Sequence, residues 1–328
     1  MKKDFIVSNK IDMACYTQAL ELIEKSKYIL IITHVNPDAD TISSALALSN
    51  LFHENRIKHK VFNVSSDLPN NLDFIERFDK ITDQLPKFFD LAISVDCGTY
   101  QRLGIELDPS IPLINFDHHK SNNDFGAINI VDPLKSSTAE IVYDFFKHNG
   151  LYITKNSATS LYVGIYDDSL AFSLGRCDEL TFEKVNHLVQ YGANPSFIAN
   201  NLLRRDSLAK YRIIPKVLNS LELYKEGEVA TIFAKEEWFK ETGAHNRDCE
   251  DALDMIMSME IVKIAFFVRI VNGFSRVSLR SKGQVDVSKI AALFNGGGHF
   301  NSAGCVIKTL NVDESKELVL KEVFELYK

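Results

Sequence analysis

The sequence contains no apolar run long enough to cross a lipid bilayer. Its longest apolar runs, at 28–32 and 264–268, fall far short of the roughly 20 residues that a transmembrane helix needs. The amino terminus, Met-Lys-Lys-Asp-Phe, lacks the apolar core and the small-residue cleavage site of a signal peptide. We therefore expect no membrane span and no secretory signal.

No Cys-x-x-Cys pair occurs among the five cysteines of the chain. An odd number of scattered cysteines cannot all be paired within one chain, so a disulfide framework is not expected. The chain shows no internal repeat and no low-complexity tract either. We predict a cytoplasmic protein with reduced thiols.

A broad excess of positive charge is missing as well, since 37 Lys and Arg are outnumbered by 44 Asp and Glu. The formal net charge of −7 argues against a protein that coats duplex nucleic acid through a basic surface. A small anionic substrate stays compatible with this charge, because bound metal ions can reverse the field in one cleft. At 328 residues the chain is long enough for two domains with separate cores.

Short apolar or β-branched runs alternate with helical patterns from 28 to about 135, which is typical of successive βα units. The predicted strands lie at 28–33, 60–64, 91–95, 112–116 and 127–131. Continuous apolar strands favour a parallel sheet with helices on both faces, in an α/β fold. A helix is predicted at 41–54, with Asp40 as its N-cap.

The pattern changes in the second half of the chain. Further helices are predicted at 138–148, 157–166 and 179–191, the last with Gly192 as a C-cap. Later predicted strands lie at 228–234, 261–271 and 277–280, with a helix at 288–294. We therefore predict a parallel-sheet N-terminal domain at 1–194, a helical connector at 195–226 and a smaller mixed α/β C-terminal domain at 227–328.

Aspartates and histidines follow several predicted strands, at the end where an open α/β sheet forms its ligand crevice. They are His34, Asp38, Asp40, Asp96, Asp117, His118 and His119, together with Asp167 and Asp168 near the end of a helical pattern. Any one of these residues alone is more often a helix cap or turn former than a catalytic group. Their repetition, the Asp-His-His tripeptide and the His-x-x-x-Asp-x-Asp spacing together favour a metal site.

Several carboxylates with one or two imidazoles suit hard or borderline divalent ions such as Mn²⁺, and the absence of thiolates disfavours structural zinc. One carboxylate can bridge two ions. Two metals roughly 3.5–4 Å apart can share a hydroxide and neutralise the attacking and leaving oxygens of an in-line phosphoryl displacement. This chemistry predicts hydrolysis of a phosphate ester.

The order of these motifs resembles that of the DHH phosphoesterase superfamily, over about 28 to 304. The resemblance implies two Mn²⁺ ions that share one carboxylate, with Mg²⁺ and Co²⁺ as other candidate ions. The implied ligands are His34, Asp38 and Asp96 for one ion, and Asp40, Asp96, His118 and Asp168 for the other. The implied catalytic pair is His119, facing the substrate phosphate, and Asp117, which orients its neighbours.

The C-terminal part resembles the DHH-associated domain, which binds substrate. The implied substrate-binding residues are Arg280, Ser281, Gly296, Gly297, Gly298 and His299. A triple glycine lets backbone N–H groups approach an anion, and an arginine can bind a phosphate. One departure from the family pattern lies at 169–172, which lacks the glycine usual after the aspartate of the fourth motif.

Within the superfamily, the length and the C-terminal motifs are most similar to the bifunctional oligoribonuclease and PAP phosphatase group. The resemblance implies hydrolysis of very short oligoribonucleotides (nanoRNA), of 3′-phosphoadenosine 5′-phosphate, or of both. The expected partner is therefore a short single-stranded RNA or DNA or a nucleotide phosphate. The oligomeric state stays open, with a homodimer as one candidate.

Three other hypotheses remain. A pyrophosphatase or polyphosphatase would keep the metals, but the glycine-rich motif with Arg280 disfavours it. A nucleotide-binding regulator without catalysis would not need the complete set of ligands. A long processive exonuclease would need an extended basic channel, which the acidic composition disfavours.

Overall fold

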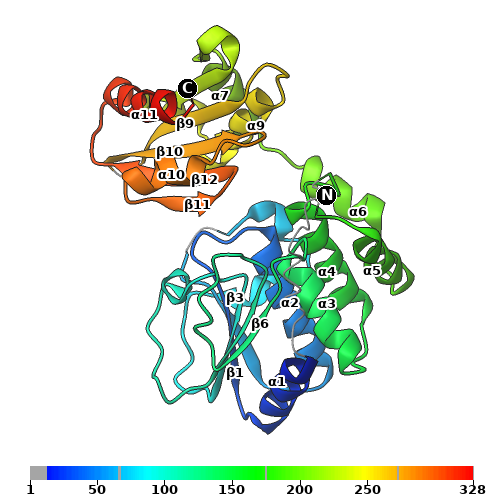
Figure 1. The fold of residues 1–328 in the computed structure, drawn as a ribbon. Helices are drawn as coiled ribbons and strands as arrows, with labels where there is room; N and C mark the ends of the chain where they lie inside the picture. Colours follow the sequence, from blue (N-terminus) through cyan, green and yellow to red (C-terminus); the bar gives the residue numbers. More distant parts are fainter. Residues whose placement is uncertain (1–12, 66–67, 174–175, 272, 328) are drawn as a thin grey trace, which may run out of the picture. The chain divides into compact units, whose positions relative to one another are not determined.

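Two units make up the chain, Met1–Arg205 and Asp206–Lys328, and each contains its own six-stranded sheet. The structure, a computed structural model, describes residues 13–65, 68–173, 176–271 and 273–327. Figure 1 shows the two sheets with their helices. Within these ranges, no helix has both the length and the apolarity that a membrane crossing requires.

The sheet of the first unit is parallel throughout, with the strand order β3-β2-β1-β4-β5-β6. Its strands are β1 (Ile29–Thr33), β2 (His59–Phe62), β3 (Ile81–Thr82), β4 (Leu91–Val95), β5 (Leu113–Asp117) and β6 (Ile128–Val131). Every residue of β1, β4 and β5 is buried, as expected for parallel strands covered on both faces. The predicted parallel α/β sheet is confirmed.

The α-helices of this unit share one hydrophobic core with one face of the sheet. They are α1 (Met13–Lys25), α2 (Ala39–Glu54), α3 (Thr138–His148), α4 (Lys155–Asp168), α5 (Glu179–Gln190) and α6 (Pro195–Leu203), and the 3₁₀-helices η1 (Asn70–Leu72) and η2 (Phe78–Lys80) lie near the strand ends. The opposite face is covered by the 3₁₀-helix η3 (Tyr100–Leu103) and neighbouring loops. The predicted helical cover therefore consists of α-helices on one face and a 3₁₀-helix on the other.

Aromatic packing joins strand β5 to helix α3. Phe116 in β5 and Phe145 in α3 are fully buried, and their rings meet edge to face with centroids 5.3 Å apart. Burying a side chain of this size stabilises a fold by about 2–3 kcal/mol. This contact therefore holds β5 against α3 close to the point where the Asp117-His118-His119 tripeptide begins.

Helix α2 begins earlier than the sequence predicted. Its N-cap is Asp38, whose Oδ1 accepts a hydrogen bond of 3.1 Å from the backbone N–H of Thr41. Asp40 lies in the first turn of the helix, so its prediction as the N-cap was wrong. Both aspartates are cap-forming residue types, and the residue after Pro37 took the position.

The second unit contains a mixed sheet with the strand order β11-β12-β10-β9-β8-β7. Only the β8–β9 pair is parallel. Its strands are β7 (Glu222–Tyr224), β8 (Val229–Ala234), β9 (Ile264–Val271), β10 (Phe274–Ser281), β11 (Gly297–His299) and β12 (Ser302–Ile307). The predicted smaller mixed α/β unit is confirmed.

Helices cover both faces of this second sheet, with one core on each side. One core includes α7 (Leu208–Leu218), α8 (Glu236–Thr242), η5 (Asn246–Cys249) and α9 (Asp251–Met257), and the other includes α10 (Val287–Leu293) and α11 (Val312–Leu326). The short η4 (Lys225–Gly227) connects β7 to β8. Of the predicted connector at 195–226, α6 falls in the first unit, whereas α7 and β7 fall in the second.

Candidate metal centre

The strand order of the first sheet reverses between β1 and β4. From β1 the chain first adds β2 and β3 on one side, and then returns to add β4, β5 and β6 on the other. In open parallel sheets, the crevice outside the carboxyl ends at such a switch point is where ligands bind. His34 directly follows β1 and Asp96 directly follows β4, so the topology places both at this crevice.

Seven of the predicted residues lie together there. Their candidate ligand atoms form three groups within which all atoms lie within 4.8 Å of one another. The groups are His34, Asp38 and Asp96; Asp96, His118 and His119; and Asp40, His118 and Asp168. Because Asp96 and His118 each belong to two groups, the three groups form one cluster, which we call the carboxylate–imidazole cluster.

Asp96 lies at the centre of the cluster and is almost fully buried. Its backbone has a φ of 60°, in the left-handed region that non-glycine residues seldom adopt, and strained backbone of this kind gathers at functional sites. Its Oδ2 lies 3.4 Å from Nε2 of His34, and its Oδ1 lies 3.6 Å from Nε2 of His118. One carboxylate therefore faces two imidazoles with different oxygens.

His34 has a buried ring nitrogen without a hydrogen-bond partner. Its Nδ1 lies 2.9 Å from the carbonyl oxygen of Val35, so Nδ1 carries the proton and donates it to that oxygen. Its Nε2 is the unpartnered nitrogen and lies 3.4 Å from Oδ2 of both Asp38 and Asp96. A buried lone pair directed at two carboxylates fits a divalent cation between them, because most buried polar atoms in proteins have a partner and carboxylates with imidazoles are common metal ligands.

The charge around His34 agrees with this fit. Burial by itself would lower the pKa of His34, but interactions with Asp38 and Asp96 raise it to about 10. The three side chains thus favour a positive charge among them, which a proton or a metal ion can supply.

His118 is oriented in the same way as His34. Its Nδ1 lies 3.3 Å from the carbonyl oxygen of Lys135, and its Nε2 lies 3.4 Å from Oδ2 of Asp168. In metal sites a histidine typically donates its second ring N–H to a carbonyl or carboxylate, which fixes the ring and the tautomer. Both imidazoles therefore direct Nε2 into the carboxylate–imidazole cluster.

Two further carboxylates complete the cluster, and neither has a cationic side chain bonded to it other than histidine among the described residues. Asp40 is buried in the first turn of α2, and burial raises its pKa, with Asp96 and Asp168 adding to the effect. Burial also raises the pKa of Asp168, the last residue of α4, to about 6. Close carboxylates repel one another, and divalent ions relieve this repulsion.

The predicted catalytic pair is also in contact. Nδ1 of His119 lies 2.7 Å from Oδ1 of the fully buried Asp117. Burial lowers the pKa of His119, but Asp117 and Asp96 outweigh it and raise the pKa above its ordinary value. Asn122 holds Asp117 from the other side, since its Nδ2 donates to Oδ2 of Asp117 at 2.5 Å. Asp117 thus orients the ring of His119.

The sequence did not single out Asn122 or Thr138. Thr138 donates its hydroxyl to Oδ1 of Asp96 at 2.8 Å and its backbone N–H to Oδ2 of Asp40 at 2.7 Å. Both residues are ordinary turn and cap formers in the sequence. The closeness of Asn122 to the Asp-His-His tripeptide along the chain was a signal, but it was too weak to identify this residue.

The predicted substrate-binding residues all lie in the second unit. Arg280 in β10 is half-exposed, and its Nε lies 3.5 Å from Oδ1 of Asp254. Ser281 points to the opposite face of the sheet, where its hydroxyl donates to the carbonyl of Val285 at 2.6 Å. On the face of Arg280, the neighbouring hydroxyl is that of Ser278. Arg280 and Ser281 therefore do not share one surface.

The three predicted glycines differ in what surrounds them. A Cβ on Gly296 would lie 2.2 Å from the carbonyl oxygen of Gly304, and one on Gly298 would lie 2.4 Å from that of Ser302. A Cβ on Gly297 would meet nothing within 4 Å, and Gly297 pairs with Gly304 at the edge of the sheet. Close packing explains Gly296 and Gly298, whereas nothing inside this unit requires a glycine at 297. The side chain of His299 lies outside the described part of the structure.

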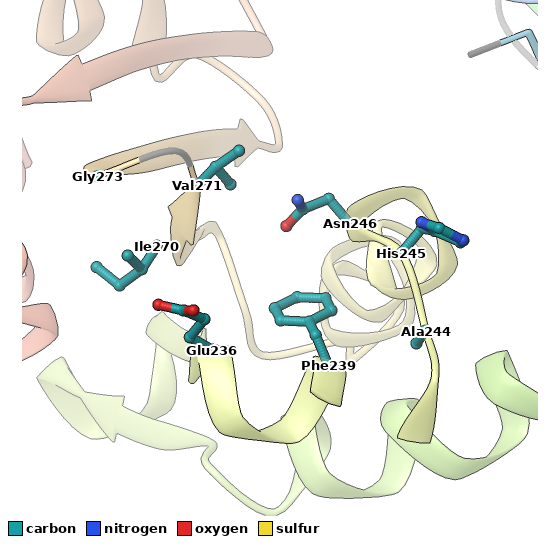
Figure 2. A pocket seen from close by; sticks show the side chains of 8 residues that line it. All are labelled: Glu236, Phe239, Ala244, His245, Asn246, Ile270, Val271 and Gly273. Carbon is teal, nitrogen blue, oxygen red and sulfur yellow. The ribbon is translucent and has the colours of Figure 1, made fainter. Parts of the chain in front are cut away.

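The second unit also contains a cavity of about 340 Å³. Figure 2 shows Glu236 and Phe239 from α8 on one side of it, with Asn246 and the β9 residue Ile270 around the rest. Among the described residues, no group of three or more candidate metal ligands occurs there. The candidate metal centre is therefore the carboxylate–imidazole cluster of the first unit.

Two family profiles match the chain: the DHH family, N-terminal domain, at residues 28–165, and the DHHA1 domain at residues 226–328. Residues 28–165 are therefore a DHH-family domain, and residues 226–328 are a DHHA1 domain. This family is a group of metal-dependent hydrolases, so the predicted class of enzyme is confirmed. The predicted resemblance to this superfamily is confirmed as well.

Relatives of known name match nearly the full length of the chain. The bifunctional oligoribonuclease and PAP phosphatase NrnA of Thermus thermophilus is 29% identical over 316 residues, which cover 95% of this chain and 94% of that protein. The protein of the same name from Bacillus subtilis is 25% identical, covering 89% and 93%. The cyclic-di-AMP phosphodiesterase PdeA of Listeria monocytogenes is 26% identical, covering 95% of this chain and 50% of that protein.

Solved structures share the fold. An exopolyphosphatase-related protein from Bacteroides fragilis superposes with a TM-score of 0.88 at 24% identity, covering 98% of this chain and 100% of that chain. RecJ of Thermus thermophilus in complex with Mn²⁺ superposes with a TM-score of 0.57 at 13% identity, covering 95% and 54%. At these identities the likeness concerns the fold.

Proposed function

We propose that the chain is a divalent-metal phosphoesterase that hydrolyses very short oligoribonucleotides and 3′-phosphoadenosine 5′-phosphate. The observation that carries the metal-dependent chemistry is the buried, unpartnered Nε2 of His34, which faces the carboxylates of Asp38 and Asp96. The choice of substrate rests on the relatives named NrnA, whose length this chain matches almost completely.

The ligand types of the cluster support two Mn²⁺ ions, because carboxylates and imidazoles are groups that such ions accept. We assign His34, Asp38 and Asp96 to one ion. We assign Asp40, Asp96, His118 and Asp168 to the other, with Asp96 shared. When bound, the ions supply an activated water and neutralise charge on the phosphoryl group.

The side chains of His119, Asp117 and Asn122 stabilise the charge of the substrate phosphate. Asp117 stabilises the imidazolium form of His119 through Nδ1, and this positive charge stabilises negative charge on a phosphate oxygen. Asn122 holds Asp117 in the orientation that this requires. The phosphate is thereby stabilised as negative charge develops on it.

Substrate recognition is assigned to the second unit. The guanidinium of Arg280 suits a phosphate group, and the missing side chain at Gly297 lets a ligand approach the backbone of β11. Gly296 and Gly298 keep β11 close to β12, so they support this surface indirectly. Hydrolysis of pyrophosphate or polyphosphate remains the alternative function. A comparison of substrates separates this alternative from the proposed function.

The test compares initial rates with Mn²⁺ on RNA dinucleotides to pentanucleotides, on 3′-phosphoadenosine 5′-phosphate and on pyrophosphate. The proposal predicts turnover of the first two substrate types and little turnover of pyrophosphate. A preference for pyrophosphate would contradict the assigned substrate while leaving the metal centre intact.

The central ligand is tested by Asp96→Ala, which removes the shared carboxylate. We expect turnover to fall by more than about 100-fold, beyond the usual effect of groups that only support a metal ligand. Asp178→Ala is the matched control, since it removes the carboxylate that caps α5 outside the cluster. Normal turnover by a folded Asp96→Ala protein would refute the assignment.

A further inference from the structure

Thr138 connects two carboxylates of the proposed metal centre, the shared ligand Asp96 and its neighbour Asp40. It is the first residue of α3 and is fully buried. Its hydroxyl donates to Oδ1 of Asp96 at 2.8 Å, and its backbone N–H donates to Oδ2 of Asp40 at 2.7 Å. Thr138 thus bonds to one oxygen of Asp96, which is assigned to both ions, and to one oxygen of Asp40, which is assigned to one ion.

The position of Thr138 is fixed by contacts outside the cluster. Ser137 is the N-cap of α3, and its hydroxyl accepts the backbone N–H of Glu140 at 3.2 Å. Oε2 of Glu140 in turn accepts the backbone N–H of Ser136 at 2.9 Å, and Oε1 pairs with Lys184 of α5 at 2.9 Å. The start of α3 is therefore held by α5 and by its own cap, in addition to its hydrogen bonds to Asp96 and Asp40.

A role confined to helix formation does not account for the Thr138 hydroxyl. The cap of α3 is supplied by Ser137, and the Thr138 hydroxyl bonds to a carboxylate rather than to the backbone of the helix. A β-branched side chain has restricted χ1 freedom, so the direction of this hydroxyl is well defined. Oδ1 of Asp96 accepts this hydroxyl and also lies 3.6 Å from Nε2 of His118.

We propose that Thr138 is a positioning residue that holds Asp96 and Asp40 in the relative orientation required for two neighbouring divalent cations. The proposal rests on the proposed function, because it concerns ions assigned there. Without the hydroxyl, Asp96 loses a hydrogen bond that restrains its rotation, while the bond from the backbone to Asp40 stays. Loss of this hydrogen bond therefore affects Asp96, the shared ligand, and weakens the binding of the two metal ions.

Thr138→Val tests the proposal, because it keeps the shape and the backbone N–H but removes the hydroxyl. Calorimetric titration of the metal-free protein with Mn²⁺ should give two sites in the original chain. In the variant we expect at least one affinity to fall by about 10- to 100-fold, as is typical when a group supporting a metal ligand is removed. The electron paramagnetic resonance signal of coupled Mn²⁺ ions should weaken in parallel.

Two control variants separate positioning from folding. Thr138→Ser keeps the hydroxyl and should restore both affinities and the coupled signal. Ser157→Ala removes a different buried hydroxyl, which donates to the carbonyl of Ala47 at 3.3 Å, and should leave Mn²⁺ binding unchanged. Both comparisons use the full chain.

Each outcome bears on the proposal. Two unchanged affinities in Thr138→Val would overturn the role of Thr138 and leave the metal centre standing. If Thr138→Val fails to fold, whereas Thr138→Ser folds, the hydroxyl serves the fold and the positioning role is overturned. If the original chain binds no Mn²⁺, both this inference and the proposed metal centre are overturned.

Discussion

Single residues with left-handed backbone mark the surroundings of the metal centre. Asp96 has a φ of 60°, and three consecutive residues after Asp168 have positive φ values as well: 48° at Leu170, 55° at Ala171 and 65° at Phe172. A left-handed conformation costs an L-residue roughly 1–2 kcal/mol. None of these three positions is a glycine, yet the backbone there is left-handed. Phe172 holds it by packing against Tyr162 and Tyr166.

Replacing Ala171 by glycine should relieve part of this strain. Ala171 is exposed, so the substitution removes no buried contact. We expect Ala171→Gly to raise the free energy of unfolding by about 1 kcal/mol, measured by urea unfolding of the metal-free protein. Ala14→Gly in α1, where the backbone is helical, should change stability in the opposite direction. A destabilised Ala171→Gly protein would show that the left-handed turn carries no strain.

The candidate ligands could be predicted from sequence because Asp and His recur at fixed places after strands. Asn122 and Thr138 could not, since their importance arises from hydrogen bonds to residues 5 and 42 positions away. Asp40 was predicted as a helix cap because Asp38 and Asp40 offer the same cap chemistry. The sequence also grouped Ser281 with Arg280, although alternation along β10 places them on opposite faces.

Among the elements, the buried strands were the easiest to predict. β1 and β4 are continuous apolar runs, and the predicted helix at 138–148 coincides with α3. Short elements such as β11 and α9 were missed, because three to seven residues give too few periods of a pattern. The strand order, with its reversal between β1 and β4, is a tertiary property that periodicity does not contain.

The β11 edge allows a test that separates packing from ligand binding. Gly297→Ala places a methyl group in open space, so the free energy of unfolding should stay unchanged. The methyl group should nevertheless block ligand access to the backbone. A hydrogen bond to a charged group contributes about 1.5 kcal/mol, so its loss should lower kcat/KM by about 10-fold. The measurement is steady-state kinetics on an RNA dinucleotide.

A packing glycine of the same strand region serves as the contrast. Gly296→Ala should lower the stability of the second unit, because its Cβ would collide with the backbone of Gly304. Unchanged kinetics for Gly297→Ala would exclude this edge from substrate recognition. Comparison with Gly296→Ala shows how a loss of folding would affect the kinetics, so it separates a folding defect from a loss of ligand binding.

At the scale of the whole molecule, the function that we propose places metal chemistry in one unit and substrate recognition in the other. The first unit contains every residue of the carboxylate–imidazole cluster, and the second contains Arg280 and the triple glycine. Composition and the change of pattern near the connector were enough to predict two α/β domains. The unit boundary after Arg205 was not predicted, since α6 and α7 are both helical and differ only in what they pack against.

The central claim is that residues distant along the chain hold two cations at the carboxyl ends of β1, β4 and β5. Anomalous diffraction at the manganese absorption edge, from crystals of the full chain grown with Mn²⁺, tests it most directly. We predict two peaks, one among His34, Asp38 and Asp96, and one among Asp40, Asp96, His118 and Asp168. No peak at the cluster, or peaks only at other places, would contradict the account.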